Sequence, residues 1–578
     1  MADTSFFTDS QALVQDALQG LCKTSPELVL DLENKIISRS THDPSKHVTL
    51  ISGGGAGHEP AHAAFVGQGM LSAAVSGHVF ASPSVSQIVE AIHSVGGPAG
   101  TILIVKNYTG DIFHFNLAAE KARARWGQRV EVLVVSDDVA VGREQSGKVG
   151  RRGLAGTVLV HKILGALSAR GKSIDELLAI GSQVTKNLVT CGVSQGHVNI
   201  PGTAPQRDPV QLELGMGIHN EPGLYVLNPR PTLDELIDRM LELLTGMDDR
   251  DRAYVDFGGQ TPVLLLNNLG GTSQLEMSAI LHHLLESLDK QNLPVIRVLS
   301  GTFMTSLDAS GFSITLLKAT PEMLDAIDDV TTAVGWPRSI ATPRAIVGNR
   351  VIKSKRETSE PSFSNAGPKV DPYSFTAAIT ASCQSLLAAE PRITQSDKVV
   401  GDGDCGTTLS RGANAVLKSL LESPVMPFTS ASAAVMRVAL ALESSIDGTS
   451  GALYELFVNA LATALQTMPE ETTTLETWAR AAGIALTRLQ SMTPARVGDR
   501  TIMDALIPYV EALAKGDVDQ AVEAARKGCE STRGMKACLG RAVYVAGENW
   551  DKVADPGAEG VVAIVEGLSR SKGATELA

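Results

Sequence analysis

Short apolar runs that end abruptly in polar residues alternate with amphipathic segments through the first 345 residues of the chain. The clearest runs read HVTLISGGG, TILIVKNYTGD, VEVLVVSDD, TPVLLLNNLGG and FSITLLKAT. Continuous apolar runs of this length are typical of parallel strands that are buried on both faces. The segments between them, such as SPSVSQIVEAIHSV and PTLDELIDRMLELL, have the spacing of amphipathic helices. The pattern predicts one or two α/β domains, with a boundary near residue 195.

The pattern of apolar and polar residues changes at residues 352–371, which read IKSKRETSEPSFSNAGPKVD. This segment is polar, contains two prolines and has no periodic apolar pattern, so it is predicted to be a linker. Beyond it, about eight segments have helical spacing and strand-like runs are almost absent. We therefore predict a multidomain chain, with an α/β lobe over residues 1–351 and an all-α lobe over residues 372–578.

The composition of the 578-residue chain excludes several classes of function. Hydrophobic residues make up 43% and charged residues 20%, the ordinary balance of a globular protein. The formal net charge is -13 and no run is rich in Lys or Arg, so we expect no nucleic-acid and no membrane partner. We recognise no signal peptide and no apolar stretch long enough to span a bilayer. The six cysteines form no CxxC pair, which fits a reducing compartment such as the cytoplasm and argues against structural zinc.

A glycine-rich loop, SGGGAGHEP at residues 52–60, directly follows the predicted strand HVTLI. Its glycines permit close approach of the backbone to a ligand and leave N–H groups free to donate. A plain tight turn is the alternative, but the His-Glu pair that follows favours a ligand loop. Lys106 and Asp111 follow the strand TILIV and would lie at the same sheet edge, as a hydrogen-bond donor and a general base. On its own, such a pair is more often a salt bridge at a strand end.

His219 lies in the stretch GMGIHNEPG, where flanking glycines leave little side-chain bulk to hinder a ligand. An unprotonated imidazole can accept a hydrogen bond, bind a metal or add to a carbonyl carbon. A lone histidine is usually structural, yet its glycine neighbours favour a function. The stretch GREQSGK at residues 142–148 resembles the start of a P-loop, but Val149 stands where a magnesium-binding Ser or Thr is required. We therefore expect an ordinary basic loop there.

Three aspartates, Asp397, Asp402 and Asp404, crowd into the stretch SDKVVGDGDCGTT, which precedes a predicted helix. They offer hard oxygen ligands for Mg2+ or Ca2+, and the stretch lacks the DxDxDG pattern and the distal Glu of an EF-hand. Backbone N–H groups at residues 406–408 would favour a phosphate, but carboxylates repel phosphate unless a divalent cation bridges them. We predict that the aspartates hold Mg2+ and that the metal holds a polyphosphate. An acidic turn at a helix start is the alternative.

Three further loops between predicted helices contain small or polar residues. GTSG at residues 448–451 precedes a helix and could hold the same phosphates. GDRT at residues 498–501 and DPG at residues 555–557 also mark loops between helices, although turn chemistry alone would explain them.

Taken in chain order, these stretches resemble the single-chain, ATP-dependent dihydroxyacetone kinases, also called triokinases or glycerone kinases. The resemblance covers essentially the whole chain and is carried by SGGGAGHEPAH, VKNYTGD, GRRGLAGTVLVHK, LGMGIHNEPG, NNLGG, GDGDCGTT, DGTSGALY, GDRT and DPGA. It implies an N-terminal α/β lobe of two subdomains that binds the triose, and a C-terminal barrel of eight helices that binds ATP and Mg2+. It also implies transfer of the γ-phosphate of ATP to dihydroxyacetone, with glyceraldehyde as a second substrate, by a homodimer whose lobes meet across subunits.

The resemblance implies a role for each matched residue. His219 matches the histidine that binds the substrate carbonyl covalently as a hemiaminal, and Asp111 matches the general base. The other substrate-contacting positions match Gly55, Ala56, Gly57, His58 and Lys106. The metal-binding aspartates match Asp397, Asp402 and Asp404. The nucleotide-binding positions match Asp402, Asp404, Cys405, Gly406, Thr407, Thr408, Thr449, Ser450, Thr501, Ile502, Asp555, Pro556 and Gly557.

Three positions depart from the pattern of the family. Asp447 stands where a glycine is common before the second phosphate loop, and it adds negative charge there. Ile502 replaces a common Met beside the nucleotide, and Ala56 replaces a frequent Ser in the glycine loop. None of these changes removes a proposed catalytic group. Two other classes of function stay open: a lyase that cyclises FAD with the helical lobe alone, and a non-catalytic sensor of triose.

Overall fold

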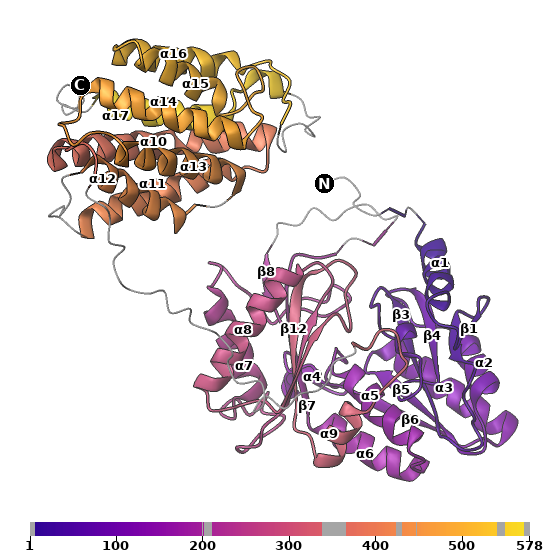
Figure 1. Ribbon diagram of the computed structural model, residues 1–578. Helices are drawn as coiled ribbons and strands as arrows, with labels where there is room; N and C mark the ends of the chain where they lie inside the picture. The colour runs from indigo at the N-terminus through magenta and orange to yellow at the C-terminus, as the bar shows by residue number, and fades with distance from the viewer. Residues whose placement is uncertain are drawn as a thin grey trace. The chain divides into compact units, whose positions relative to one another are not determined.

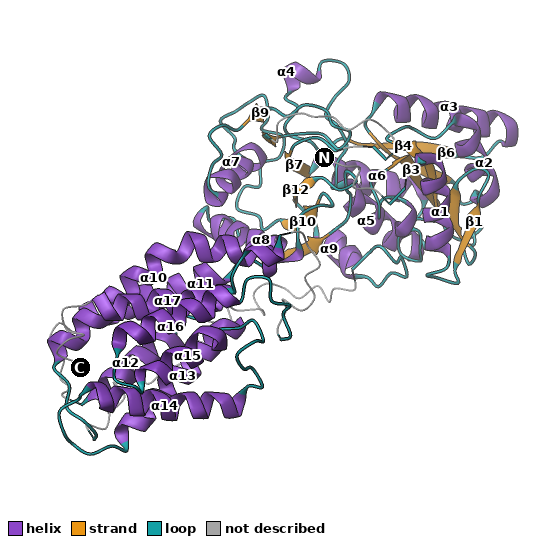
Figure 2. Cartoon of the chain, turned by 90° about the horizontal axis from the view of Figure 1, so that it is seen from above, coloured by secondary structure: helices purple, strands orange, loops and turns teal. Residues whose placement is uncertain are grey.

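The computed structural model describes residues 6–7, 9–198, 200–201, 211–337, 366–422, 430–446, 448–539 and 549–570. The chain divides into two compact units, Met1–Ile352 and Lys353–Ala578. Among the described residues, β-strands occur in the first unit, whereas the second is built from helices (Figure 1; Figure 2). The predicted combination of an α/β part with an all-α part is confirmed. The predicted linker falls mostly outside the described residues.

The first sheet has six strands in the order β1-β2-β4-β3-β5-β6. Their bounds are β1 Leu28–Asp31, β2 Ile36–Arg39, β3 Thr49–Ala56, β4 Ala73–Val79, β5 Thr101–Lys106 and β6 Val130–Val135. The last four are parallel to one another, so the carboxyl ends of β3 and β5 lie at one sheet edge. Helices cover both faces, which explains the apolar runs: α2 Val85–Val95 and α3 Thr109–Trp126 on one face, and α1 Ser10–Cys22, α5 Thr157–Ala169 and α6 Ile174–Lys186 on the other.

The second sheet has the order β11-β10-β12-β7-β8-β9 and is mostly antiparallel. Its bounds are β7 Leu188–Gln195, β8 Leu212–Leu214, β9 Tyr225–Val226, β10 Val263–Asn268, β11 Arg297–Gly301 and β12 Ser310–Leu317. The prediction of parallel strands holds for β10 where it pairs with β11, but it is wrong for β12, which is antiparallel to both of its neighbours, β10 and β7. Their apolar runs arise because both faces of these strands are buried. The helices α7 (Leu233–Thr245) and α8 (Gln274–Lys290) cover one face, and a core shared with the first sheet and α9 (Pro321–Asp328) covers the other. Burial on both faces does not depend on strand direction.

The change from one sheet to the other comes earlier in the chain than we predicted. The strand β7, which ends at Gln195, already belongs to the second sheet, so a boundary near residue 195 is too late. Its partner β12 lies more than a hundred residues further on, which local periodicity cannot reveal. The GREQSGK stretch forms the one-turn helix α4 (Arg143–Ser146), and the Arg143 guanidinium lies 4.2 Å from the centre of the Tyr254 ring. It is a surface turn and not a phosphate loop.

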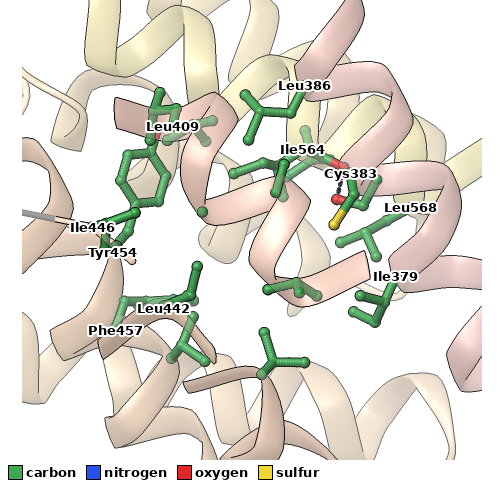
Figure 3. A pocket seen from close by; sticks show the side chains of 18 of the residues that line it. Ile379, Cys383, Leu386, Leu409, Leu442, Ile446, Tyr454, Phe457, Ile564 and Leu568 are labelled. Atoms are coloured by element: carbon green, nitrogen blue, oxygen red, sulfur yellow. Dashed lines mark hydrogen bonds between the residues drawn. The ribbon is translucent and has the colours of Figure 1, made fainter. Parts of the chain in front are cut away.

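The described part of the second unit contains eight α-helices. They are α10 Pro372–Val400, α11 Cys405–Glu422, α12 Ala431–Glu443, α13 Gly448–Gln466, α14 Leu475–Met492, α15 Met503–Leu513, α16 Val518–Ser531 and α17 Pro556–Arg570. Each helix contacts the next and α17 returns to α10, so the contacts close into a ring. Between these helices lies an apolar cavity of about 230 Å³, with Leu386, Leu409, Tyr454 and Phe457 in its lining (Figure 3). No helix in the part of the chain that the structure describes has the length and apolarity needed to cross a bilayer.

Candidate active site

Two charged side chains and a glycine meet where β3 and β5 end. Lys106 is the last residue of β5, and Asp111 lies in the first turn of α3. A Cβ atom on Gly54 of β3 would lie 3.5 Å from Asp111 Oδ2 and 3.7 Å from Lys106 Nζ, so both side chains reach the glycine loop. Both are buried, and neither Lys106 Nζ nor Asp111 Oδ1 has a hydrogen-bond partner among the described residues. Buried polar atoms without partners are expected where a polar ligand binds.

His219 forms the centre of a second cluster beside this sheet edge. Its Nε2 atom lies 2.9 Å from Nε2 of His58, and its Nδ1 atom lies 3.0 Å from Oε1 of Glu221. The His58 Nδ1 atom lies 2.8 Å from the carbonyl oxygen of Thr305, and the backbone N–H of His219 donates to Oε2 of Glu221. Both imidazole rings are therefore held at both nitrogens.

These contacts dictate where the protons lie. Carboxylate and carbonyl oxygens only accept, so Nδ1 of His219 and Nδ1 of His58 must each carry a hydrogen. If both rings were neutral, their facing Nε2 atoms would both be acceptors. A hydrogen bond between these two atoms at 2.9 Å therefore requires one further proton. Burial, reinforced by Lys106, lowers the pKa of His58 well below its usual value. Although burial opposes it, the hydrogen bond and charge of His219 lower the pKa of Glu221 to about 2.

Aromatic rings enclose the histidine pair. Tyr108 and Phe80 meet the His219 ring edge-on, with centroids 4.5 Å and 5.4 Å away, and Phe80 stacks on His58 at 5.3 Å. The Tyr108 hydroxyl is buried and lacks a hydrogen-bond partner among the described residues. Sequence reasoning missed Glu221, Tyr108 and Phe80. The first two lie inside the motifs GIHNEPG and VKNYTGD, whereas Phe80 has no local signal.

The glycine loop is packed more tightly than the sequence suggested. A Cβ atom on Gly55 would lie 2.7 Å from the backbone nitrogen of Ala81, so only glycine fits there. Gly57 has φ +99, and its N–H group donates to Oε2 of Glu59 instead of being free for a ligand. Ala56 is the last residue of β3 and is buried.

A buried ion pair anchors the loop that carries His219. Arg152 lies 2.7 Å from Asp138 Oδ2 and donates to the carbonyl oxygen of Gly215, at the start of the loop. Burial raises the pKa of Asp138 to about 6, although the charge of Arg152 opposes this effect. Removing Arg152 would leave the charge of the buried Asp138 uncompensated, which is strongly destabilising.

In the second unit the three predicted metal-binding aspartates converge. Oxygen atoms of Asp397, Asp402 and Asp404 all lie within 4.8 Å of one another. Asp397 is buried at the end of α10 and accepts a hydrogen bond from the backbone N–H of Cys405, whereas the other two are exposed. Three carboxylates at this separation repel one another unless a cation lies among them, and hard oxygen ligands fit Mg2+. The first turn of α11 holds the predicted phosphate-binding residues Cys405, Gly406, Thr407 and Thr408.

Not all of the backbone N–H groups in this turn are free. The N–H groups of Cys405 and Thr408 donate to Asp397 Oδ2 and to the carbonyl oxygen of Asp404. The thiol of Cys405 belongs to a hydrophobic cluster. Thr449 and Ser450 lie in the first turn of α13, and their side chains lie outside the part that the structure describes.

The two remaining loops touch each other. A Cβ atom on Gly557 would lie 2.3 Å from Cγ2 of Ile502, so the DPG loop packs directly on the residue after GDRT. The N–H groups of Gly498 and Thr501 donate to the Asp504 carboxylate, which fixes the GDRT turn. Burial, reinforced by the charges of Asp504 and Asp397, raises the pKa of Asp555 to about 7. Pro556 starts α17.

Comparison with known proteins identifies the family. The Dak1 domain model matches residues 19–335, and the DAK2 domain model matches residues 399–570. The chain belongs to the dihydroxyacetone kinase family. It is 42% identical to a dihydroxyacetone kinase of Komagataella pastoris over 96% of each chain, and 39% identical to dihydroxyacetone kinase 2 of Saccharomyces cerevisiae over 99% of this chain and 100% of that one. It is also 37% identical to a human triokinase/FMN cyclase over 96% of each chain.

A solved member of the dihydroxyacetone kinase family has the same architecture. The native structure of the dihydroxyacetone kinase of C. freundii matches 98% of this chain with a TM-score of 0.64 and 31% identity. A second structure of that kinase, in complex with AMP-PNP and Mg2+, matches 98% of this chain with a TM-score of 0.63 and 30% identity.

Proposed function

We propose that this protein transfers the γ-phosphate of Mg-ATP to a hydroxyl group of dihydroxyacetone, and also of glyceraldehyde, while the triose is bound covalently to His219. The observation that carries the proposal is the arrangement of His219, His58 and Glu221 beside the unpartnered Lys106 and Asp111. The names of relatives that match the chain over nearly its whole length support it. Residues 1–351 would bind the triose, residues 352–371 would link the lobes, and residues 372–578 would bind ATP.

The proton shared by the two histidines suits the formation of a hemiaminal. His219 passes its Nε2 proton to His58, and the bared Nε2 lone pair forms a bond to the carbonyl carbon of the triose. The π electrons of the carbonyl move to its oxygen, which takes the proton from His58. The product ring is a cation with Nδ1–H facing Glu221, whose carboxylate stabilises it. Because the step requires a carbonyl carbon, glycerol and other polyols are excluded.

The Asp111 carboxylate and the Lys106 ammonium act in the transfer of the γ-phosphate. Asp111 accepts the proton of the triose hydroxyl as that oxygen attacks the γ-phosphorus, while the bond from the γ-phosphorus to the oxygen bridging to the β-phosphate breaks and ADP leaves. Lys106, which has no hydrogen-bond partner among the described residues, would donate hydrogen bonds to oxygen atoms of the bound triose. Burial lowers the pKa of Lys106, while Asp111 and Glu221 oppose that effect and favour its charged form. The covalent bond fixes the hydroxyl for attack and lowers the entropic part of the barrier.

The helical unit would supply the nucleotide site. Asp397, Asp402 and Asp404 would hold Mg2+, which would neutralise phosphate charge during the transfer. The first turn of α11 and residues 448–451 would hold the phosphates, and the touching loops at 498–502 and 555–557 would enclose the rest of the nucleotide. We further propose a cytoplasmic homodimer in which the two kinds of lobe meet across subunits.

Release of ADP from Mg-ATP, with and without dihydroxyacetone, tests the proposal. We expect triose-dependent release, together with a mass increase of one triose that disappears in His219→Asn. A protein that binds the triose without releasing ADP would be a sensor. The human relative named triokinase/FMN cyclase motivates a second candidate, cyclisation of FAD by the helical unit. Cyclisation would survive His219→Asn, whereas the kinase reaction would not.

A further inference from the structure

Tyr454 connects two helices that carry proposed nucleotide loops. It lies on α13, and its hydroxyl donates a hydrogen bond of 2.7 Å to the carbonyl oxygen of Gly557, which is the second residue of α17. A Cβ atom on Gly560 would lie 2.5 Å from that hydroxyl oxygen, so the missing side chain at Gly560 leaves room for the contact. Burial, followed by the charges of Cys405 and Asp555, raises the pKa of Tyr454 well above its usual value. The hydroxyl therefore remains a donor.

The rest of the side chain packs against two hydrophobic clusters. Tyr454 contacts the hydrophobic cluster that contains Cys405 and Leu409, just after the aspartate triad, and also the cluster that contains Ile502. Its ring lines the cavity beside Ile446, which directly precedes the loop at the start of α13 (Figure 3). One side chain of α13 thus forms a hydrogen bond to the start of α17 and packs against the clusters that hold Cys405 of α11 and Ile502, the residue after GDRT.

We infer that Tyr454 is a positioning residue for the nucleotide: its hydroxyl holds the start of α17 at the spacing from α13 that bound Mg-ATP requires. The inference rests on the proposed function. Without the hydroxyl, the Gly557 carbonyl loses the hydrogen bond that connects it to α13, and the DPG loop can move away from Ile502. The hydrogen bond joins Tyr454 and Gly557 and includes none of the three aspartates, so binding of the metal alone should change little.

The substitution Tyr454→Phe removes only the hydroxyl and keeps the ring in the cavity wall. Tyr509→Phe is the matched control, because Tyr509 lines the same cavity from α15. We would titrate the full-length protein with Mg-AMP-PNP in a calorimeter and measure KM for ATP and for dihydroxyacetone. We expect the Kd for the nucleotide and the KM for ATP to rise about tenfold in Tyr454→Phe, the factor that one ordinary hydrogen bond provides.

KM for dihydroxyacetone, attachment of the triose to His219 and both nucleotide constants of Tyr509→Phe should stay at the wild-type values. A purely structural role would lower the midpoint of thermal unfolding without raising the Kd of the folded protein. That result, or an equal loss of affinity in Tyr509→Phe, would overturn the inference. If the wild type binds nucleotide but releases no ADP with triose, the proposed function fails, while the calorimetric comparison still decides the role of Tyr454. If the wild type binds no nucleotide, both fail.

Discussion

The Nε2 atom of His219 lies 2.9 Å from the Nε2 atom of His58, and the opposite nitrogen of each ring faces an oxygen that can only accept. One proton must therefore lie between the rings. His58 is the group through which that proton can leave His219 and reach the oxygen of a substrate carbonyl. The pair combines a nucleophile with an acid, and neither residue alone would do both.

His58→Asn should slow attachment of the triose to His219 by about 100-fold, the lower end of the usual contribution of a positioned acid. The rate can be followed by mass spectrometry of the protein after mixing with dihydroxyacetone. His114→Asn is the matched control, because His114 lies on α3 and contacts the carbonyl oxygen of Pro83. Wild-type attachment rates in His58→Asn would contradict the proposed proton path.

Glu221→Gln should weaken the covalent complex without preventing it. The amide oxygen of glutamine can still accept from the His219 ring, but the negative charge that stabilises the cationic adduct is lost. We expect the dihydroxyacetone concentration for half-maximal attachment to rise about tenfold, which corresponds to the difference between a charged and a neutral hydrogen bond.

The control for this change is Glu213→Gln. The Glu213 carboxylate accepts a hydrogen bond from Gly223 in the same loop. Equal weakening in both variants would show that the loop, and not the charge next to His219, is responsible.

Asp402→Asn should abolish most Mg-dependent turnover while leaving triose attachment unchanged. One of three converging carboxylates is removed, and loss of a metal that is worth several kcal/mol to the transition state lowers kcat/KM by about 100-fold or more. Asp519→Asn removes the same charge from an exposed position in the first turn of α16. An unchanged dependence of turnover on Mg2+ in Asp402→Asn would rule out the metal site.

Local patterns in the sequence predicted the parts of the fold that depend on local burial. The change from continuous apolar runs to helical spacing separates the α/β part from the all-α part. Each pattern of apolar residues depends on how many faces of the element are buried. Strand order and direction were not predictable in this way. β12 pairs with both β7 and β10, and the contacts that decide this lie far apart in the chain.

The candidate site shows the same limit. Residues within one motif, such as the three aspartates, were recognised together and do converge. Glu221 was within reach of the same reasoning, since it lies two residues after His219. Thr305 and Phe80 could not be predicted in this way, because only tertiary packing brings them to the histidines. The Thr305 carbonyl lies 247 residues from His58 in the chain. The roles of all these residues stay predictions until they are measured.

Buried histidines should make the first unit sensitive to acid. His161 is fully buried on α5, and its Nε2 atom lies 3.0 Å from Nδ1 of His62. Burial, reinforced by Lys106, lowers the pKa of His161 from 6.5 to about 3. Between these values the unfolded chain binds a proton that the folded chain does not, so the free energy of unfolding must fall as the pH decreases from 6.5 toward 3.

His161→Gln removes this one titration and should reduce the slope of the free energy of unfolding against pH by up to about 1.4 kcal/mol per pH unit. The slope comes from urea unfolding of the full-length protein at several pH values between 4 and 6.5, with both variants compared at each pH. His282→Gln is the control, because the His282 side chain is 66% exposed. A change in absolute stability caused by the glutamine does not affect the comparison, which depends on the slope alone. Equal slopes in the wild type and in His161→Gln would show that His161 is protonated in the folded protein. The prediction that His161 is neutral beside His62 would then be wrong.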